Sequence, residues 1–285
     1  MAVLQPVPKP GFVPELRASA NKSKPAGDKD LIDSFLSSLF YCGPGSNHNP
    51  VPRAMEYAVM GQAQRFRPIL SLRVARMLGC ETDHTLRAAA AVEIIHSASL
   101  IIDDLPCMDN EATRRGLPSV HIQFGEPTAI LAGFSMVALA ARMVMEASAS
   151  DVECMRLRRF QMALLKTLDC SSLVGGQSLD LLLTGSERDQ MRHHVNDLKT
   201  VPLFQLAVEA GCVSNPGGVP PELESFGRQF GKAFQLTDDL LDGELQDRKI
   251  LDDTYEQCRA SLLPFGAHAE PLHDLVEFLA QRSRA

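Results

Sequence analysis

The chain has 285 residues, 45% of them hydrophobic, which is enough to bury one large core. Its formal net charge of −7 argues against a surface that binds nucleic acid or anionic lipid, so no nucleic-acid partner is expected. The seven cysteines include no CxxC pair and follow no secretory signal, which predicts free thiols in a reducing, cytoplasmic compartment and excludes a disulfide scaffold.

Residues 1–28 are rich in proline and lack a compact apolar segment, so we expect a flexible arm followed by a single domain over 29–285. Apolar residues then recur at helical spacing, and no convincing alternating strand interrupts them. The expected helices cover 30–40, 52–60, 69–79, 83–104, 128–147, 152–168, 188–212, 220–243, 250–263 and 270–283. No apolar run reaches the roughly 20 residues of a membrane span. The sequence therefore predicts one all-α domain without a membrane span.

Two of these helices end in aspartates, an arrangement that is electrostatically unfavourable for the folded state. A helix C-terminus already carries about half a negative charge, and neighbouring carboxylates repel one another. A cation must offset this charge, and oxygen ligands without His or Cys favour Mg²⁺. The two clusters are Asp103, Asp104 and Asp109, and Asp238, Asp239 and Asp242.

The spacing of the aspartates suggests how they meet a metal. Asp238 and Asp242 are four residues apart, so they share a helix face, and Gln235 lies on the same face. Pro106 ends the first helix, which allows Asp109 to fold back beside Asp103. We expect the six carboxylates to converge on divalent metal.

Basic residues occur near both clusters. Taken singly, an exposed Arg or Lys is more often a solvated surface charge than a ligand. Taken together with two acidic clusters, these residues describe a site for two diphosphate groups. They are Arg67 in "FRP", Arg114 and Arg115 in "ATRRGLP", and Lys199, followed by Thr200, in "DLKT".

The segment "IIHSASLIIDDLPCMDNEATRRGLPSVHIQFGE" closely resembles the first aspartate-rich region of the trans-isoprenyl diphosphate synthases, the family of farnesyl and geranylgeranyl diphosphate synthases. "LVGGQSLDL", "DLKT" and "FQLTDDLLD" resemble further blocks of that family in the same order. The resemblance runs from about residue 30 to the C-terminus. It implies an isoprenoid synthase type of helical bundle around a deep central cavity, usually in a homodimer. It also implies a Mg²⁺-dependent prenyltransferase that joins isopentenyl diphosphate to an allylic diphosphate.

Carried over position by position, the resemblance gives each candidate residue a role. It implies metal binding by Asp103, Asp104, Asp109 and Asp238, supported by Asp239 and Asp242. It implies contact with the allylic diphosphate by Arg114 and Lys199, and with isopentenyl diphosphate by Arg67, His96 and Arg115. It places Thr200 and Gln235 at the reacting carbons. Another histidine, His121, is interpreted as structural.

Product length should depend on Ala98. This residue lies five positions before Asp103 on the same helix, about 7.5 Å deeper at 1.5 Å per residue. In the resembled family a bulky aromatic residue there tends to stop growth at farnesyl. A methyl side chain leaves the tunnel open, so we expect geranylgeranyl diphosphate as the main product, with farnesyl diphosphate next.

The sequence departs from the family pattern at two places. Gln64 stands where a lysine usually binds isopentenyl diphosphate, and the segment after Asp242 lacks the usual lysine-bearing loop. Arg248 and Lys249 are candidates to replace the missing cation. These departures keep open a second interpretation, a catalytically weak homologue that acts as a non-catalytic partner subunit. A terpene cyclase is a third, disfavoured because the chain has a second DDxxD motif.

Overall fold

The computed structural model describes residues 27–40, 49–146, 150–245 and 247–283. Apart from Gly27 and Asp28, the predicted arm lies outside the described residues. Nearly all described elements are helices, in agreement with the all-α prediction. In chain order they are α1 Asp28–Leu39, α2 Val51–Met60, α3 Phe66–Met77, α4 Asp83–Asp103, β1 Thr113–Arg114, β2 Leu117–Pro118, α5 Val120–Phe124, α6 Glu126–Met145, α7 Asp151–Thr167, α8 Leu173–Leu182, α9 Gly185–Gly211, α10 Pro221–Leu241, α11 Arg248–Leu262, η1 Leu263–Ala269 and α12 Glu270–Arg282.

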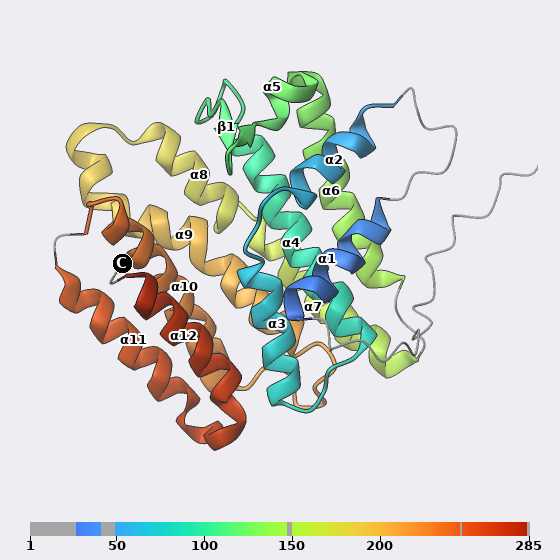
Figure 1. The fold of residues 1–285 in the computed structure, drawn as a ribbon, viewed down its shortest axis with the longest axis vertical. Helices are drawn as coiled ribbons and strands as arrows, with labels where there is room; N and C mark the ends of the chain where they lie inside the picture. The colour runs from blue at the N-terminus through green and yellow to red at the C-terminus, as the bar shows by residue number, and fades with distance from the viewer. Residues whose placement is uncertain (1–26, 41–48, 147–149, 246, 284–285) are drawn as a thin grey trace, which may run out of the picture.

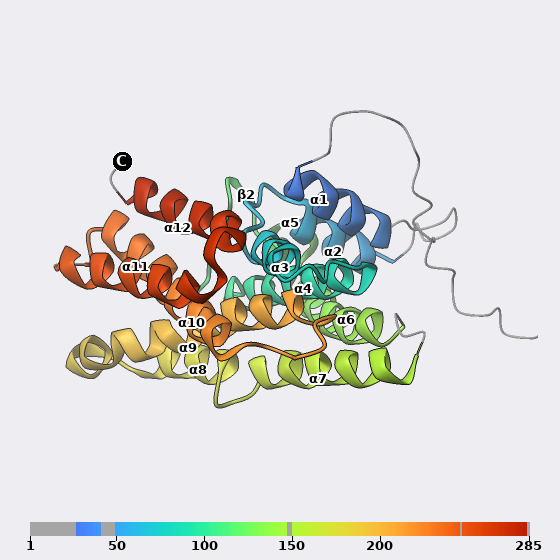
Figure 2. The same cartoon turned by 90° about the horizontal axis from the view of Figure 1, so that it is seen from below.

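Helix α4 forms the centre of the bundle, as its all-round apolar sequence predicts. It packs against α3, α6 and α9 (Figure 1). A capping box begins the helix: the side chain of Thr82 accepts from the backbone N–H of Thr85, and the side chain of Thr85 accepts from the backbone N–H of Thr82. Buried alanines along α4 allow the neighbouring helices to approach closely. Figure 2 shows the layers around it, with α1 and α12 on one side and α7 and α8 on the other. This packing brings the C-terminal end of α4, with its aspartates, to the interior of the fold.

Helices α4 and α6 are both long and apolar enough to cross a membrane, so the expectation that no apolar segment reaches that length is wrong. Within α4, 72% of the 18-residue apolar stretch is buried inside the protein, whereas the corresponding share in α6 is 39%. Burial of this extent is typical of the core helix of a soluble bundle, and α4 is such a helix here.

The second aspartate-bearing helix, α10, begins after Pro220 and ends before Gly243, as its prolines and glycine predict. Gly243 has φ +76°, a left-handed conformation that turns the chain directly towards α11. A buried hydrogen bond between the hydroxyls of Thr237 and Tyr255 joins α10 to α11. Arg248 donates to the backbone oxygen of Ser283, which fixes the C-terminal end of α12 near the start of α11.

Five described elements were not expected from the sequence. They are the two-residue hairpin strands β1 and β2, the short helix α5, helix α8, which contains the "GGQ" motif, and the 3-10 helix η1. The hairpin follows the first aspartate cluster and presents Arg114 and Arg115 at its turn. Arg115 adopts φ +54° and Gly116 φ +77°. A left-handed Arg is unusual, and this turn separates the directions of the two guanidinium groups.

Candidate functional site

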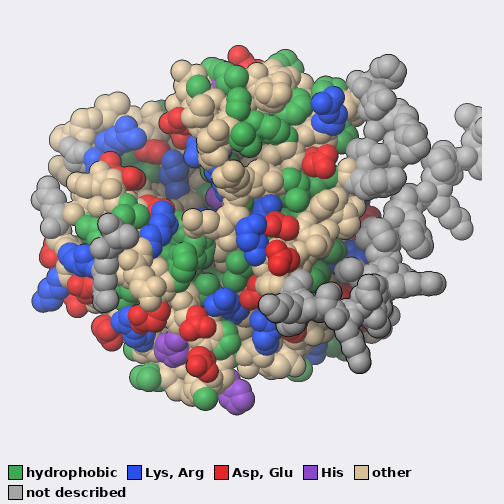
Figure 3. Space-filling view, viewed as in Figure 1, with side chains coloured by type: hydrophobic (Ala, Val, Ile, Leu, Met, Phe, Trp, Pro, Cys, Tyr) green, Lys and Arg blue, Asp and Glu red, His purple; other side chains and the backbone are tan. Residues whose placement is uncertain are grey.

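The two aspartate-bearing helix ends meet at a polar cavity of about 640 Å³. Its walls come from α3 and the residues before it, α4, the β1–β2 hairpin, α8, α9, α10 and α12. Figure 3 shows the hollow, with basic and His side chains in its depth. The predicted residues that line it are Gln64, Arg67, His96, Asp103, Arg114, Arg115, Lys199, Thr200, Gln235 and Asp238. Residues as far apart in sequence as Gln62 and Arg282 thus contribute to one site.

One side of the cavity holds two guanidinium groups around an imidazole. Arg67 Nη1 lies 3.3 Å and Arg115 Nη2 3.4 Å from His96 Nε2. Burial, reinforced by the charges of Arg67 and Arg115, lowers the pKa of His96 well below its usual value. The imidazole is therefore neutral, and its Nε2 can accept a hydrogen bond from a guanidinium.

Arg67 carries a charge that the protein leaves incompletely satisfied. Burial lowers its pKa to about 10, and its buried Nε has no hydrogen-bond partner among the described residues. Its guanidinium stacks on the ring of Phe204 at 4.6 Å from the centroid. A buried guanidinium with an unpaired donor is suited to an anionic ligand such as a diphosphate.

Beneath this cluster lies a buried ion pair that sequence reasoning missed. Arg65 Nη1 lies 2.7 Å from Glu93 Oε1, and both side chains are almost fully buried. Arg65 also contacts Asp33 at 2.8 Å and donates to the backbone oxygen of Val59. Burial opposes the charge of Arg65, but the carboxylates of Glu93 and Asp33 outweigh it and raise its pKa. Glu93 stands one helical turn before His96, a spacing that is visible in the sequence.

The cavity is also lined by Asp103 and Asp238. Burial, together with the charges of Asp109 and Asp104, raises the pKa of Asp103 to about 6. Burial also raises the pKa of Asp238. Asp238 Oδ1 lies 3.0 Å from Arg282 Nη2 but has no well-aligned hydrogen-bond donor among the described residues. Buried carboxylate oxygens with incomplete compensation are suitable ligands for a hard divalent cation.

The other four predicted metal ligands do not line the cavity. Asp104 is buried against Arg114, whose Nε lies 3.0 Å away. Asp239 accepts from Gln235 Nε2 at 2.8 Å. Asp109 accepts from Gln177 Nε2 at 3.0 Å, and Asp242 is exposed at the end of α10. Within the described ranges, no three His, Cys, Asp or Glu side chains gather as a metal cluster. The expected convergence of six carboxylates is therefore not reproduced, because adjacent side chains on a helix point in different directions.

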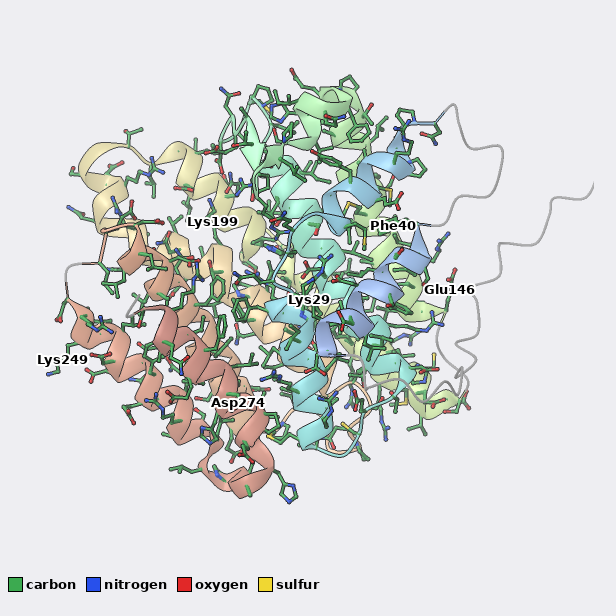
Figure 4. All side chains as sticks on the ribbon, in the orientation of Figure 1. Lys29, Phe40, Glu146, Lys199, Lys249 and Asp274 are labelled. Atoms are coloured by element: carbon green, nitrogen blue, oxygen red, sulfur yellow. The ribbon has the colours of Figure 1, made fainter. Side chains whose placement is uncertain are left out.

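Thr200 and Gln235 also line the polar cavity and are hydrogen-bonded to each other. Thr200 Oγ1 donates to Gln235 Oε1 at 2.6 Å, and the amide of Gln235 donates onward to Asp239. The chain of bonds fixes which end of the Gln235 amide faces Thr200. Lys199, labelled in Figure 4, lies with its Nζ 2.6 Å from Asp180 Oδ2. The sequence reasoning overlooked Asp180, although the "GGQSLDL" motif contains it.

An apolar cavity of about 500 Å³ adjoins the polar one. Both cavities are lined by Asp103, which marks the junction between them. Ala98 lies in the apolar wall, as the sequence predicts. Across from it, an added Cβ on Gly133 would lie 3.0 Å from Ile102 Cδ1, so a larger residue there would narrow the space. The apolar cavity therefore forms a channel that begins at the carboxylate of Asp103 and is suited to a hydrocarbon chain.

The two departures from the expected pattern have different outcomes. Gln64 lies at the exposed rim of the polar cavity. Neither Arg248 nor Lys249 lines it, and Figure 4 shows Lys249 at the outer edge of the molecule. The additional cation comes from Arg282 at the end of α12. The proposed replacement by Arg248 or Lys249 is therefore wrong, since α11 carries both away from the cavity.

Comparisons with known proteins agree with this geometry. The polyprenyl synthetase family model matches residues 48–260. The chain is 39% identical over 199 residues to geranylgeranyl pyrophosphate synthase 4 of Arabidopsis thaliana, covering 67% of this chain and 52% of that protein. It is 36% identical over 221 residues to the heterodimeric geranylgeranyl pyrophosphate synthase large subunit 1, chloroplastic, of the same plant, covering 75% and 58%. The chain thus spans little more than half the length of these relatives.

Solved structures match more completely. A FPP/GFPP synthase from Zymomonas mobilis has a TM-score of 0.80 and 30% identity, covering 88% of this chain and 96% of that one. A geranyltranstransferase from Thermotoga maritima has a TM-score of 0.74 and 26% identity, covering 90% and 97%. The described helices therefore reproduce almost the whole architecture of these structures.

Proposed function

We propose, because this chain belongs to the polyprenyl synthetase family, that it is a prenyltransferase that condenses isopentenyl diphosphate with an allylic prenyl diphosphate. One observation carries the proposal. The apolar channel meets the polar cavity at Asp103, and the guanidinium groups of Arg67 and Arg115 line the same polar cavity. A prenyl tail and two diphosphate heads require this combination of surfaces.

The metal we propose is Mg²⁺, held by Asp103 and Asp238. The support is the oxygen chemistry of these half-buried carboxylates and the Oδ1 of Asp238, which is paired with Arg282 but accepts no well-aligned hydrogen bond. When bound, Mg²⁺ supplies positive charge that stabilises the departing diphosphate. The roles of Asp104, Asp109, Asp239 and Asp242 would be indirect, since their carboxylates have the protein partners or exposed positions described above.

The remaining side chains would position the substrates and stabilise charge. Lys199 and Arg114 offer preorganised cations to the allylic diphosphate as its C–O bond breaks. Arg67, Arg115 and His96 would hold isopentenyl diphosphate. Thr200 and Gln235 present a hydroxyl and an amide, weak dipoles that can face an allylic cation without trapping it. The final proton can leave to the released diphosphate, so no side-chain base is needed.

We propose geranylgeranyl diphosphate as the main product, with farnesyl diphosphate next. The small side chains of Ala98 and Gly133 keep the apolar channel open. The two Arabidopsis relatives are named geranylgeranyl pyrophosphate synthases, which supports the same product.

A homodimer is also proposed. Apolar side chains are exposed on α6 and α8, and Phe134, at 79% exposure, also lines the apolar channel. A partner covering this face would complete the channel wall. We expect a dimer in analytical ultracentrifugation and a monomer for Phe134→Asp, and a monomeric unmodified protein would refute the assignment. The described cysteines are all free, which supports a cytoplasmic location.

The test of the enzyme is an assay of purified protein with Mg²⁺, farnesyl diphosphate and labelled isopentenyl diphosphate. We expect a longer prenyl diphosphate, formed only without EDTA. The second candidate, a non-catalytic partner subunit, is favoured by the uncharged Gln64 at the diphosphate rim. No turnover alone, with altered turnover of an added prenyl synthase, would support that candidate. Formation of a hydrocarbon instead would indicate a cyclase.

A further inference from the structure

A second cavity is larger than the polar cavity that holds Asp103 and Asp238. It is an open groove of about 1030 Å³ between α7 and α10, with α9 as its floor. In Figure 2, α7 lies below α9 and α10. Helix α9 separates the groove from the polar cavity, because Lys199 and Thr200 line the polar cavity and Val201 and Gln205 line the groove.

The groove combines cationic walls with an apolar floor. Arg158, Arg159 and Lys166 extend from α7, and Arg228 and Lys232 from α10. Lys232 pairs with Asp197 at 3.3 Å. The other four cations have no ion-pair partner among the described residues. The apolar lining includes Met155, Met162, Val201 and Leu206. A protein of net charge −7 thus concentrates unpaired positive charge along an apolar groove.

Among the described residues, the only other acidic one that lines the groove is Glu209, and its carboxyl group is only partly ionised near neutral pH. Burial, with a contribution from the carboxylate of Glu224, raises the pKa of Glu209 to about 7, and Lys166 opposes this rise. No described residue donates a hydrogen bond to the Glu209 side chain.

We propose that this groove is a second binding site, separate from the polar cavity, for a single anionic amphiphile of the prenyl diphosphate class. The diphosphate would lie between the cations of α7 and α10, and the hydrocarbon chain along the methionines. An anionic bilayer is disfavoured as the occupant, because the net charge of −7 repels an extended negative surface, whereas one ligand senses the local cations. The choice of ligand rests on the proposed function, since that reaction supplies such molecules.

The test is calorimetric titration of the full chain with the S-thiolo analogue of geranylgeranyl diphosphate in excess EDTA, which suppresses metal-dependent binding. We expect binding that weakens about tenfold in Arg158→Gln/Arg228→Gln, where two charge-assisted contacts are lost. The control Arg53→Gln/Arg142→Gln removes the same charge elsewhere and should bind as the unmodified chain does. Glu209→Gln should bind more tightly, because it removes a carboxylate from the groove.

Competition identifies which features of the ligand are used. Inorganic pyrophosphate and geranylgeraniol should each bind more weakly than the analogue, since each lacks one half of it. Equal binding by either, equal weakening in both double variants, or sedimentation with phosphatidylglycerol vesicles would overturn the proposal. Groove binding without any synthase activity in Mg²⁺ would instead refute the proposed function. Activity without groove binding would refute only the second site.

Discussion

Replacing Asp103 by Asn should stabilise the metal-free protein while abolishing its proposed activity. Burial raises the pKa of Asp103 from 3.8 to about 6, a difference of about 2 units. At 1.36 kcal/mol per unit, the ionised carboxylate costs the fold about 3 kcal/mol, which partial solvent access reduces to about 2. The raised pKa means that the native state holds this proton more tightly than the unfolded chain. The cost is therefore complete above pH 6 and disappears as the pH falls towards 3.8.

Urea unfolding in EDTA measures this effect. At pH 8 we expect Asp103→Asn to raise the free energy of unfolding by about 2 kcal/mol, and at pH 5 by roughly half as much. The matched control is Asp242→Asn, an exposed aspartate whose replacement should change stability by less than about 0.5 kcal/mol. If Asp103→Asn is no more stable than the unmodified protein at pH 8, then the carboxylate is not held at an energetic cost.

Three further predictions follow from the same geometry. Ala98→Phe should shorten the main product, because the ring would enter the apolar channel, and an unchanged product profile in chromatography would contradict this assignment. Arg65→Met should lower the free energy of unfolding by about 3–5 kcal/mol, since it leaves the buried Glu93 without its partner, whereas Arg65→Met/Glu93→Gln should recover part of the loss in urea unfolding. Gln64→Lys adds a cation at the rim of the polar cavity and should lower the KM for isopentenyl diphosphate with little change in kcat. A change in kcat alone would place residue 64 outside the binding of that substrate.

The elements that the sequence predicts well are those with a strong local signal. The expected helix 83–104 corresponds to α4, Asp83–Asp103, since its apolar pattern, its Thr82 cap and Pro106 all act within a few residues. Helix α10 likewise lies between its prolines and Gly243. The short hairpin and α5 have no such periodicity, and packing against the bundle determines them. The sequence therefore does not predict the hairpin or α5, because a structure that depends on tertiary packing leaves no local pattern.

The site residues divide in the same way. The family resemblance predicts Asp103, His96 and Arg67 as site residues, and all three line the polar cavity. Spacing does not reveal that Asp104 turns towards Arg114, since that contact depends on the hairpin turn at Gly116. Spacing likewise does not reveal the Arg65–Glu93 pair, because Arg65 precedes α3 and Glu93 lies 28 residues later in α4.

Arg282 shows why a missing charge need not be replaced nearby in sequence. The segment between α10 and α11 is short, so α11 and α12 fold back directly on α10. Arg248 then fixes the end of α12 through Ser283, and the neighbouring Arg282 lies 3.0 Å from Asp238. A shorter connection thus removes one stretch of chain and brings another cation to the same carboxylate. Since Arg282 partly neutralises Asp238, a divalent metal bound there as proposed would compete with this guanidinium for the carboxylate.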